Sequence, residues 1–183
     1  MKCVPEGARA AAPMLITALL LCACRTAAPP LPVMPQVDVP RFMGDWYVIA
    51  SIPTRAERDA YAAVESYRLD KDGRVLTTFT FHRGGFAGPL KRYTPVGFVT
   101  AGSNGAVWGM RFLWPFRADY RVMYVDGLYT QTLIGREKRD YAWLMARTPS
   151  LSPEDYQKLT ALLAAAGYDL RGLRRVPQPP AGH

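Results

Sequence analysis

The chain has 183 residues, of which 49% are hydrophobic and 21% charged, and its net charge is +8. This length allows one domain with short extensions, and the apolar fraction is enough for a sizeable core. A basic chain can bind nucleic acid or an anionic membrane, but the charges are scattered and form no dense basic helix, so a nucleic-acid partner is not expected.

The beginning of the chain has the pattern of a targeting segment. Lys2 and Arg9 give it a basic start, and the mainly apolar run 10–22 is too short to span a membrane comfortably. A buried N-terminal helix is the alternative, but Pro13 and the lack of an amphipathic period count against it. We therefore expect residues 1–23 to be a signal peptide that is removed.

The end of this segment, Leu21-Cys22-Ala23-Cys24, resembles the lipobox of bacterial lipoproteins, in which a small residue precedes the cysteine that becomes acylated. Ala23 is small, so Cys24 fits. The resemblance implies cleavage before Cys24, a diacylglyceryl group on its sulfur and an acylated amino terminus, which together make a stable membrane anchor. Arg25 stands where an Asp tends to retain such proteins in the inner membrane, which implies the outer membrane and its periplasmic face.

The cysteines follow from this prediction. The chain has 3 of them, and Cys3 and Cys22 would leave with the leader while Cys24 is acylated. No disulfide and no thiol nucleophile are therefore expected in the mature domain.

Five prolines mark residues 25–40. Such a composition is typical of an extended, partly polyproline-like spacer. Together with Cys24, residues 24–40 are expected to form a lipidated tether that holds the folded domain away from the bilayer.

Beyond the tether, short apolar segments alternate with turn signals, which is typical of an all-β barrel or sandwich. Residues 70–73, 102–105 and 126–127 have the composition of hairpin turns, and the longer stretch 53–61 looks like a loop over an opening. Eight strands are predicted, at residues 46–52, 62–69, 74–82, 93–100, 106–112, 120–125, 129–135 and 141–147.

One helix follows the strands. Ser152 can cap it, Pro153 suits its first position, and Asp155 can answer Ser152 as in a capping box. The apolar residues that follow recur at helical spacing, so the helix is expected to pack outside the strands, within a domain of residues 41–170. Residues 171–183 are basic and rich in proline, and a flexible tail is expected there.

Eight antiparallel strands in sequence order close into an up-and-down barrel, whose interior holds side chains or one small ligand. The first strand begins with Gly44-x-Trp46 and the last ends at Arg147, a pattern that resembles the lipocalin signature. The segments "DKDGRV" and "YAWLMARTPSLS" are also similar to bacterial outer-membrane lipocalins. The resemblance implies an eight-stranded antiparallel barrel with one C-terminal α-helix and a calyx for a fatty acid or lysophospholipid. No cofactor or metal is expected: a haem or tetrapyrrole ligand is a further alternative, but the chain has no obvious axial ligand for one.

The three signature residues are expected to hold the closed end of the barrel and not to touch a ligand. Trp46 can plug that end while Arg147 lies on its indole face and donates to nearby carbonyls. Gly44 permits a close backbone approach beside the large ring.

Strand alternation predicts which side chains face the calyx. Glu65 either points into it, where a carboxyl must be paired or protonated, or lies near the mouth in water. The rings of this set can alternatively fill the interior and leave no cavity. If a cavity remains, its aromatic and apolar lining suits an acyl chain with one polar end, and Tyr120 and Tyr124 are candidates to hold a head group. The predicted lining is Glu65, Tyr67, Phe79, Phe81, Trp108, Met110, Phe112, Tyr120, Tyr124 and Trp143.

A catalytic function would need a base, and the chain offers only His82 and His183. No G-x-S-x-G, no H-E-x-x-H and no metal-spaced cluster of Cys and His is present. The sequence therefore predicts a lipid-binding or lipid-transporting protein and not an enzyme. Two alternatives stay open, an envelope lipoprotein that acts through protein partners and, less favoured, a lipid-modifying enzyme that uses His82. The sequence does not decide between a monomer and a dimer.

Overall fold

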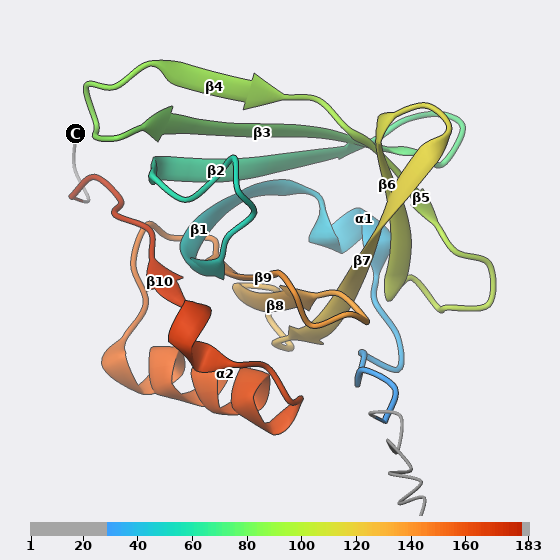
Figure 1. Ribbon diagram of the computed structural model, residues 1–183. Helices are drawn as coiled ribbons and strands as arrows, with labels where there is room; N and C mark the ends of the chain where they lie inside the picture. The colour runs from blue at the N-terminus through green and yellow to red at the C-terminus, as the bar shows by residue number, and fades with distance from the viewer. Residues whose placement is uncertain (1–28, 181–183) are drawn as a thin grey trace, which may run out of the picture.

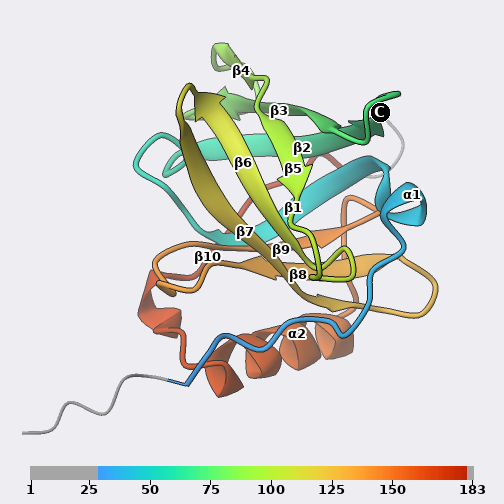
Figure 2. The ribbon, with the colours of Figure 1, turned by 90° about the vertical axis from the view of Figure 1, so that its right-hand side faces the viewer.

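The computed structural model describes residues 29–180, which form an antiparallel β-barrel with a short helix at one end and a longer helix along its side (Figures 1 and 2). The predicted signal peptide and Cys24 lie outside the described residues, as do the last three residues of the tail. None of the helices within residues 29–180 is long and apolar enough to cross a membrane.

The barrel has eight strand positions. Each of the eight positions pairs with the next one along the chain, and the pairing of β1 (Gly44–Ile52) with β9 (Ala142–Ala146) closes the ring. β4 and β5 together occupy the fourth position, because Pro95 interrupts the strand and a proline cannot donate to the ladder. The strands are β1 (Gly44–Ile52), β2 (Ala60–Leu69), β3 (Val75–Arg83), β4 (Leu90–Tyr93), β5 (Val96–Val99), β6 (Val107–Leu113), β7 (Phe116–Val125), β8 (Gln131–Gly135), β9 (Ala142–Ala146) and the added β10 (Arg174–Arg175). The predicted barrel is confirmed.

The predicted helix is also confirmed, as α2 (Pro153–Ala165). The backbone N–H of Asp155 donates to Ser152 Oγ over 3.0 Å, and the Ser152 hydroxyl donates to the Asp155 carboxylate over 2.7 Å. Leu159 and Leu163 are fully buried against the outer surface of the barrel. Burial of such side chains stabilises the docked helix by about 1.5–3 kcal/mol each.

Residues 29–40 are not an extended spacer, and this prediction is wrong for the part of the segment that the structure describes. The segment runs along α2 and then up the barrel to the short helix α1 (Val39–Phe42) (Figure 2). Leu31 and Val37 are buried, and the backbone N–H of Met34 donates to Val122 O over 2.9 Å. The prolines keep the backbone extended, but the apolar residues between them cover the barrel.

The expected flexible tail is likewise ordered as far as residue 180. The β1–β2 ladder covers only the first part of β1, because β2 has an irregularity between Tyr61 and Val64. The tail fills the gap that this leaves. β10 pairs with β1, and the side-chain amide of Gln178 donates to Val48 O over 2.8 Å and to Ala63 O over 3.0 Å. The folded unit is therefore longer at both ends than the predicted 41–170.

Candidate ligand-binding cavity

One end of the barrel is closed by Trp46. Its side chain is fully buried, and its indole N–H donates to Phe42 O over 2.9 Å. The Arg147 guanidinium lies 3.8 Å from the centre of the indole ring and donates to Asp45 O over 2.8 Å and to Met43 O over 2.7 Å. The guanidinium thus joins the end of the last strand to the start of the first one.

Gly44 is required by this arrangement. Its φ is +96°, in the region that favours glycine, and a Cβ there would lie 3.2 Å from a terminal guanidinium nitrogen of Arg147. All three residues, Gly44, Trp46 and Arg147, lie at this closed end, and that none of them touches a ligand stays a prediction.

An aromatic cluster fills the barrel directly above the plug and forms the floor of the cavity. Phe42 contacts Trp46 and Trp108, with ring centroids 4.9 and 5.5 Å apart. Trp108 stacks on Tyr120 at 5.0 Å, and the hydroxyls of Tyr67 and Tyr120 lie 2.7 Å apart in a hydrogen bond. Burial raises the pKa of Tyr120, and Glu65 raises it further, so this phenol stays neutral.

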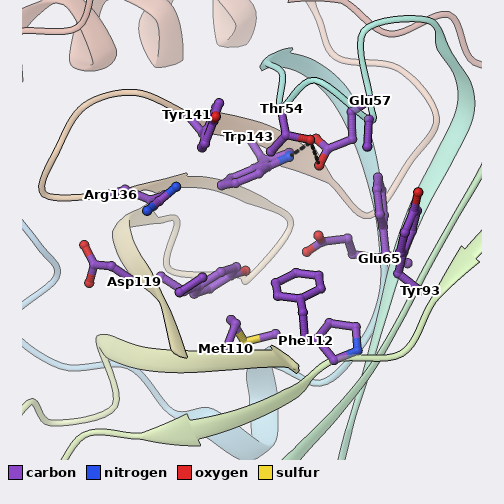
Figure 3. A pocket seen from close by; sticks show the side chains of 15 residues that line it. Thr54, Glu57, Glu65, Tyr93, Met110, Phe112, Asp119, Arg136, Tyr141 and Trp143 are labelled. Atoms are coloured by element: carbon purple, nitrogen blue, oxygen red, sulfur yellow. Dashed lines mark hydrogen bonds between the residues drawn. The ribbon is translucent and has the colours of Figure 1, made fainter. Parts of the chain in front are cut away.

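A cavity of about 260 Å³ lies above this floor (Figure 3). Its volume lies just below the usual range of ligand sites, roughly 300–1,000 Å³, which favours one slender ligand over a bulky one. Most of the wall is apolar or aromatic. The residues that line it are Thr54, Ala56, Glu57, Glu65, Phe79, Tyr93, Pro95, Met110, Phe112, Ala118, Asp119, Tyr120, Arg136, Tyr141 and Trp143.

Glu65 points into this cavity, which answers the question that the sequence left open (Figure 3). No described residue forms a hydrogen bond with its carboxyl group. Burial and, to a smaller extent, the nearby Glu57 carboxyl raise the pKa of Glu65 to about 8. At pH 7 the Glu65 carboxyl is therefore mostly protonated, and it can donate a hydrogen bond into the cavity.

Glu57 has a different environment. It comes from the loop between β1 and β2, and its carboxylate accepts hydrogen bonds from Thr54 Oγ1 over 2.7 Å and from Trp143 Nε1 over 2.9 Å (Figure 3). Burial raises its pKa, while these two hydrogen bonds act in the opposite direction. Because hydrogen bonds favour the charged form, Glu57 is better suited than Glu65 to carry the negative charge.

Arg136 brings a positive charge to the wall of the cavity. It comes from the connection between β8 and β9, where its guanidinium lies 5.1 Å from the ring centre of Tyr141 and 3.3 Å from the Asp140 carboxylate. Its Nε atom has no hydrogen-bond partner among residues 29–180. Because this Nε atom is buried, an anionic group in the cavity would be attracted by the charge of the guanidinium and not by that free donor.

Six of the ten predicted lining residues line the cavity, namely Glu65, Phe79, Met110, Phe112, Tyr120 and Trp143. Tyr67, Phe81 and Trp108 face the interior but are buried in the packed part of the core. Tyr124 was assigned to the wrong side. A register shift between Val122 and Tyr124 turns Val125 inward instead, and Tyr124 lies outside the barrel, where its hydroxyl accepts a hydrogen bond from Lys158 Nζ over 2.8 Å.

Residues that the sequence analysis missed come mainly from loops. Thr54 and Glu57 follow β1, and Arg136 follows β8, in segments where no strand alternation exists to place them. Tyr93 lies in the interrupted fourth strand. The prediction of a loop over an opening at residues 53–61 was the one signal that pointed to this part of the wall.

His82, the candidate base of the enzymatic alternative, does not line the cavity. Its Nδ1 atom lies 2.8 Å from Gly88 O across the β3–β4 hairpin. Within residues 29–180 there is also no group of three or more side chains suited to hold a metal ion.

A family model described as a lipocalin-like domain matches residues 37–178. The chain is a lipocalin. It is 30% identical to the outer membrane lipoprotein Blc of Escherichia coli over 98% of this chain and 99% of that protein. It is also 30% identical to temperature-induced lipocalin-1 of Arabidopsis thaliana over 80% of this chain and 82% of that protein.

Solved structures agree on the fold of this lipocalin. Insecticyanin from the tobacco hornworm Manduca sexta superimposes with a TM-score of 0.66 at 13% identity, over 85% of this chain and 88% of that one. Per a 4, a cockroach allergen, gives a TM-score of 0.63 at 16% identity, over 81% of this chain and 92% of that one.

Proposed function

We propose that this lipocalin binds a single-chain lipid, a fatty acid or a lysophospholipid, and is anchored through acylated Cys24 at the periplasmic face of the outer membrane. The observation that carries the proposal is an apolar cavity above a packed aromatic floor. Phe79, Met110 and Trp143 give it walls that suit an acyl chain, and each buried CH₂ contributes about 0.8 kcal/mol. Transport or storage of such lipids for membrane maintenance would be the purpose.

Among the charged groups of the cavity, Arg136 favours an anionic head, whereas the carboxylates of Glu57 and Asp119 oppose one and favour a neutral head. Arg136 offers a guanidinium to a carboxylate or phosphate. Glu65 would repel an anion if it were ionised, but its raised pKa keeps it mostly protonated at neutral pH. A protonated carboxyl donates to a ligand oxygen, and the same group would reject such a ligand at high pH.

The anchoring rests on two supports. One is the match of Leu21 to Cys24 with a lipobox. The other is the near full-length similarity to proteins named outer membrane lipoprotein, of which the Escherichia coli protein covers 98% of this chain.

Native mass spectrometry of the full protein tests the proposal. The protein is produced with its own leader and purified in mild detergent, and we expect it to carry a single-chain lipid that denaturation releases. An empty protein that also fails to take up a fluorescent acyl probe would contradict lipid binding. It would favour the alternative of an envelope lipoprotein that acts through protein partners.

A matched pair of variants ties binding to the cavity. Ala118→Trp adds a large side chain to the cavity wall, whereas Ala101→Trp adds the same side chain at an exposed turn. We expect probe binding to be lost in the first variant and retained in the second. Equal binding by both variants would place the lipid somewhere other than this cavity.

A further inference from the structure

The tip of the β6–β7 hairpin exposes a continuous apolar surface. This surface consists of four nearly consecutive side chains, interrupted only by Pro115. They are Phe112, Leu113, Trp114 and Phe116, and their exposed fractions are 63, 72, 77 and 73% in that order. Large apolar side chains scattered singly are normal on protein surfaces, but a contiguous group of this kind marks an interaction site. We call these four residues the hairpin tip.

The hairpin tip lies beside the cavity and not at the plugged end. Phe112 and Ala118, on the two strands of the hairpin, both line the cavity. The plug consists of Trp46 with Phe42 of α1, and in Figure 2 the β6–β7 turn and α1 lie on opposite sides of the barrel. Whatever the hairpin tip contacts therefore also lies next to the cavity entrance.

Two arginines flank the hairpin tip. The guanidinium groups of Arg111 and Arg117 lie 4.8 and 4.0 Å from the ring centre of Phe98, on the outer face of the barrel. Protein segments that enter the interface of a bilayer with anionic lipids typically combine exposed apolar residues, Trp among them, with flanking Lys or Arg. The hairpin tip and its two arginines have this composition.

The start of the described chain lies on the same side. The Arg139 side chain donates to Pro29 O over 2.7 Å, and the backbone N–H of Leu31 donates to Glu137 Oε1 over 3.1 Å. Arg139 and Glu137 belong to the β8–β9 connection, which also supplies Arg136 to the cavity wall. The N-terminal segment is therefore fastened beside the entrance.

The distance from this point to the proposed anchor is short. Pro29 follows Cys24 by five residues, which span at most about 18 Å when fully extended. If Cys24 is acylated, the bilayer lies within that reach of the β8–β9 connection. This step rests on the proposed function, whereas the exposure and the flanking charges of the hairpin tip do not.

We propose that the hairpin tip inserts into the interfacial region of an anionic bilayer, so that the cavity opens toward the membrane. The membrane would take the place of water around four exposed apolar side chains, and Arg111 and Arg117 would meet lipid phosphates. A single-chain lipid would then pass between the bilayer and the cavity without crossing bulk water. The partner of this surface is the lipid bilayer itself.

Quenching of Trp114 fluorescence by brominated lipids tests the insertion. The full protein is reconstituted in vesicles of phosphatidylcholine and phosphatidylglycerol with brominated acyl chains. Trp46 and Trp108 are buried and Trp143 lines the cavity, so Trp114 is the exposed indole on the outer surface, and a Trp143→Phe background removes quenching by lipid inside the cavity. We expect strong quenching in the wild type and loss of the quenched component in Trp114→Phe.

A matched pair of leucines separates a specific insertion from general adsorption. Leu113 in the hairpin tip is 72% exposed, and Leu128 in the β7–β8 turn is 76% exposed. We expect Leu113→Ser to lower the quenching of Trp114 and Leu128→Ser to leave it unchanged. Equal effects of the two substitutions would overturn the proposal.

The mass of the N-terminal peptide, measured on the same sample, shows whether Cys24 is acylated. It therefore distinguishes a failure of the proposed anchor from a failure of the proposed insertion. Acylated protein whose Trp114 stays unquenched overturns the insertion. Protein without acyl groups whose Trp114 is quenched by vesicles supports the insertion and contradicts the anchor. Shielding of Trp114 that depends on protein concentration and needs no vesicles would assign the hairpin tip to a second copy of the chain, and would also overturn the proposal.

Discussion

Replacing Glu65 by glutamine should change the stability of this lipocalin in a pH-dependent way. The pKa of Glu65 rises from 4.5 to about 8 on folding, so the folded state holds a proton that the unfolded state releases between these values. Because the folded state binds more protons in this window, the free energy of unfolding of the wild type falls as the pH rises through it. A glutamine side chain cannot ionise, so the Glu65→Gln variant lacks this loss.

The magnitude follows from the shift. One pKa unit corresponds to 1.36 kcal/mol, so the full shift corresponds to about 5 kcal/mol, and we expect roughly 3–5 kcal/mol above pH 8. Near pH 4.5 both side chains are neutral and similar in shape, so the two proteins should differ by less than about 1 kcal/mol. The substitution is therefore nearly neutral in acid and strongly stabilising in mild base.

Urea unfolding of delipidated protein at pH 5 and at pH 8.5 measures this difference. Glu154→Gln, in the exposed first turn of α2, controls for the exchange of side chains itself. The reasoning is refuted if Glu65→Gln changes the free energy of unfolding equally at both pH values. A wild type that is more stable than the variant at pH 8.5 would show that the Glu65 carboxylate has a favourable partner.

Three further substitutions test the packing of the barrel by urea unfolding. Arg147→Met removes the guanidinium over Trp46 and leaves several carbonyls without their donor. The free energy of unfolding should fall by about 2–4 kcal/mol. An unchanged unfolding midpoint would show that Arg147 does not stabilise the closed end. Gly44→Ala should cost about 1–2 kcal/mol because of the positive φ, and a neutral effect would mean that the backbone relaxes. Gln178→Ala removes the two hydrogen bonds of the ordered tail and should lower the free energy of unfolding by about 1–2 kcal/mol. An unchanged free energy of unfolding would show that the tail does not stabilise the barrel.

The elements that the sequence predicted well are those fixed by neighbouring residues. Ser152, Pro153 and Asp155 define the start of α2 within four positions. Alternation over β3 and β6 placed Phe79 and Met110 correctly, because each strand stays regular across those positions.

The errors arise where distant parts of the chain decide the outcome. Tyr124 faces outward because the pairing of β7 with β8 shifts by one residue after Val122, and no residue type near Val122 announces that shift. The segment around Leu31 looked like a spacer because prolines dominate its composition, yet the exposed face of the barrel and α2 offer its apolar residues a place to bury. The composition of a segment predicts its conformation in isolation, but not whether the folded domain offers a surface on which it can pack.

The two ends of this barrel are built from different parts of the chain, strands at the closed end and loops at the open end. This difference explains why the site was harder to predict than the fold. The closed end joins the first and last strands through Trp46 and Arg147, so any change there acts on the closure of the whole barrel. The open end takes Glu57 and Arg136 from connections whose conformation the ladder does not fix. Substitutions at these loop positions can therefore alter which ligand enters the cavity with little loss of stability. A family resemblance based on the residues of the closed end predicts the fold of this chain but does not specify its ligand.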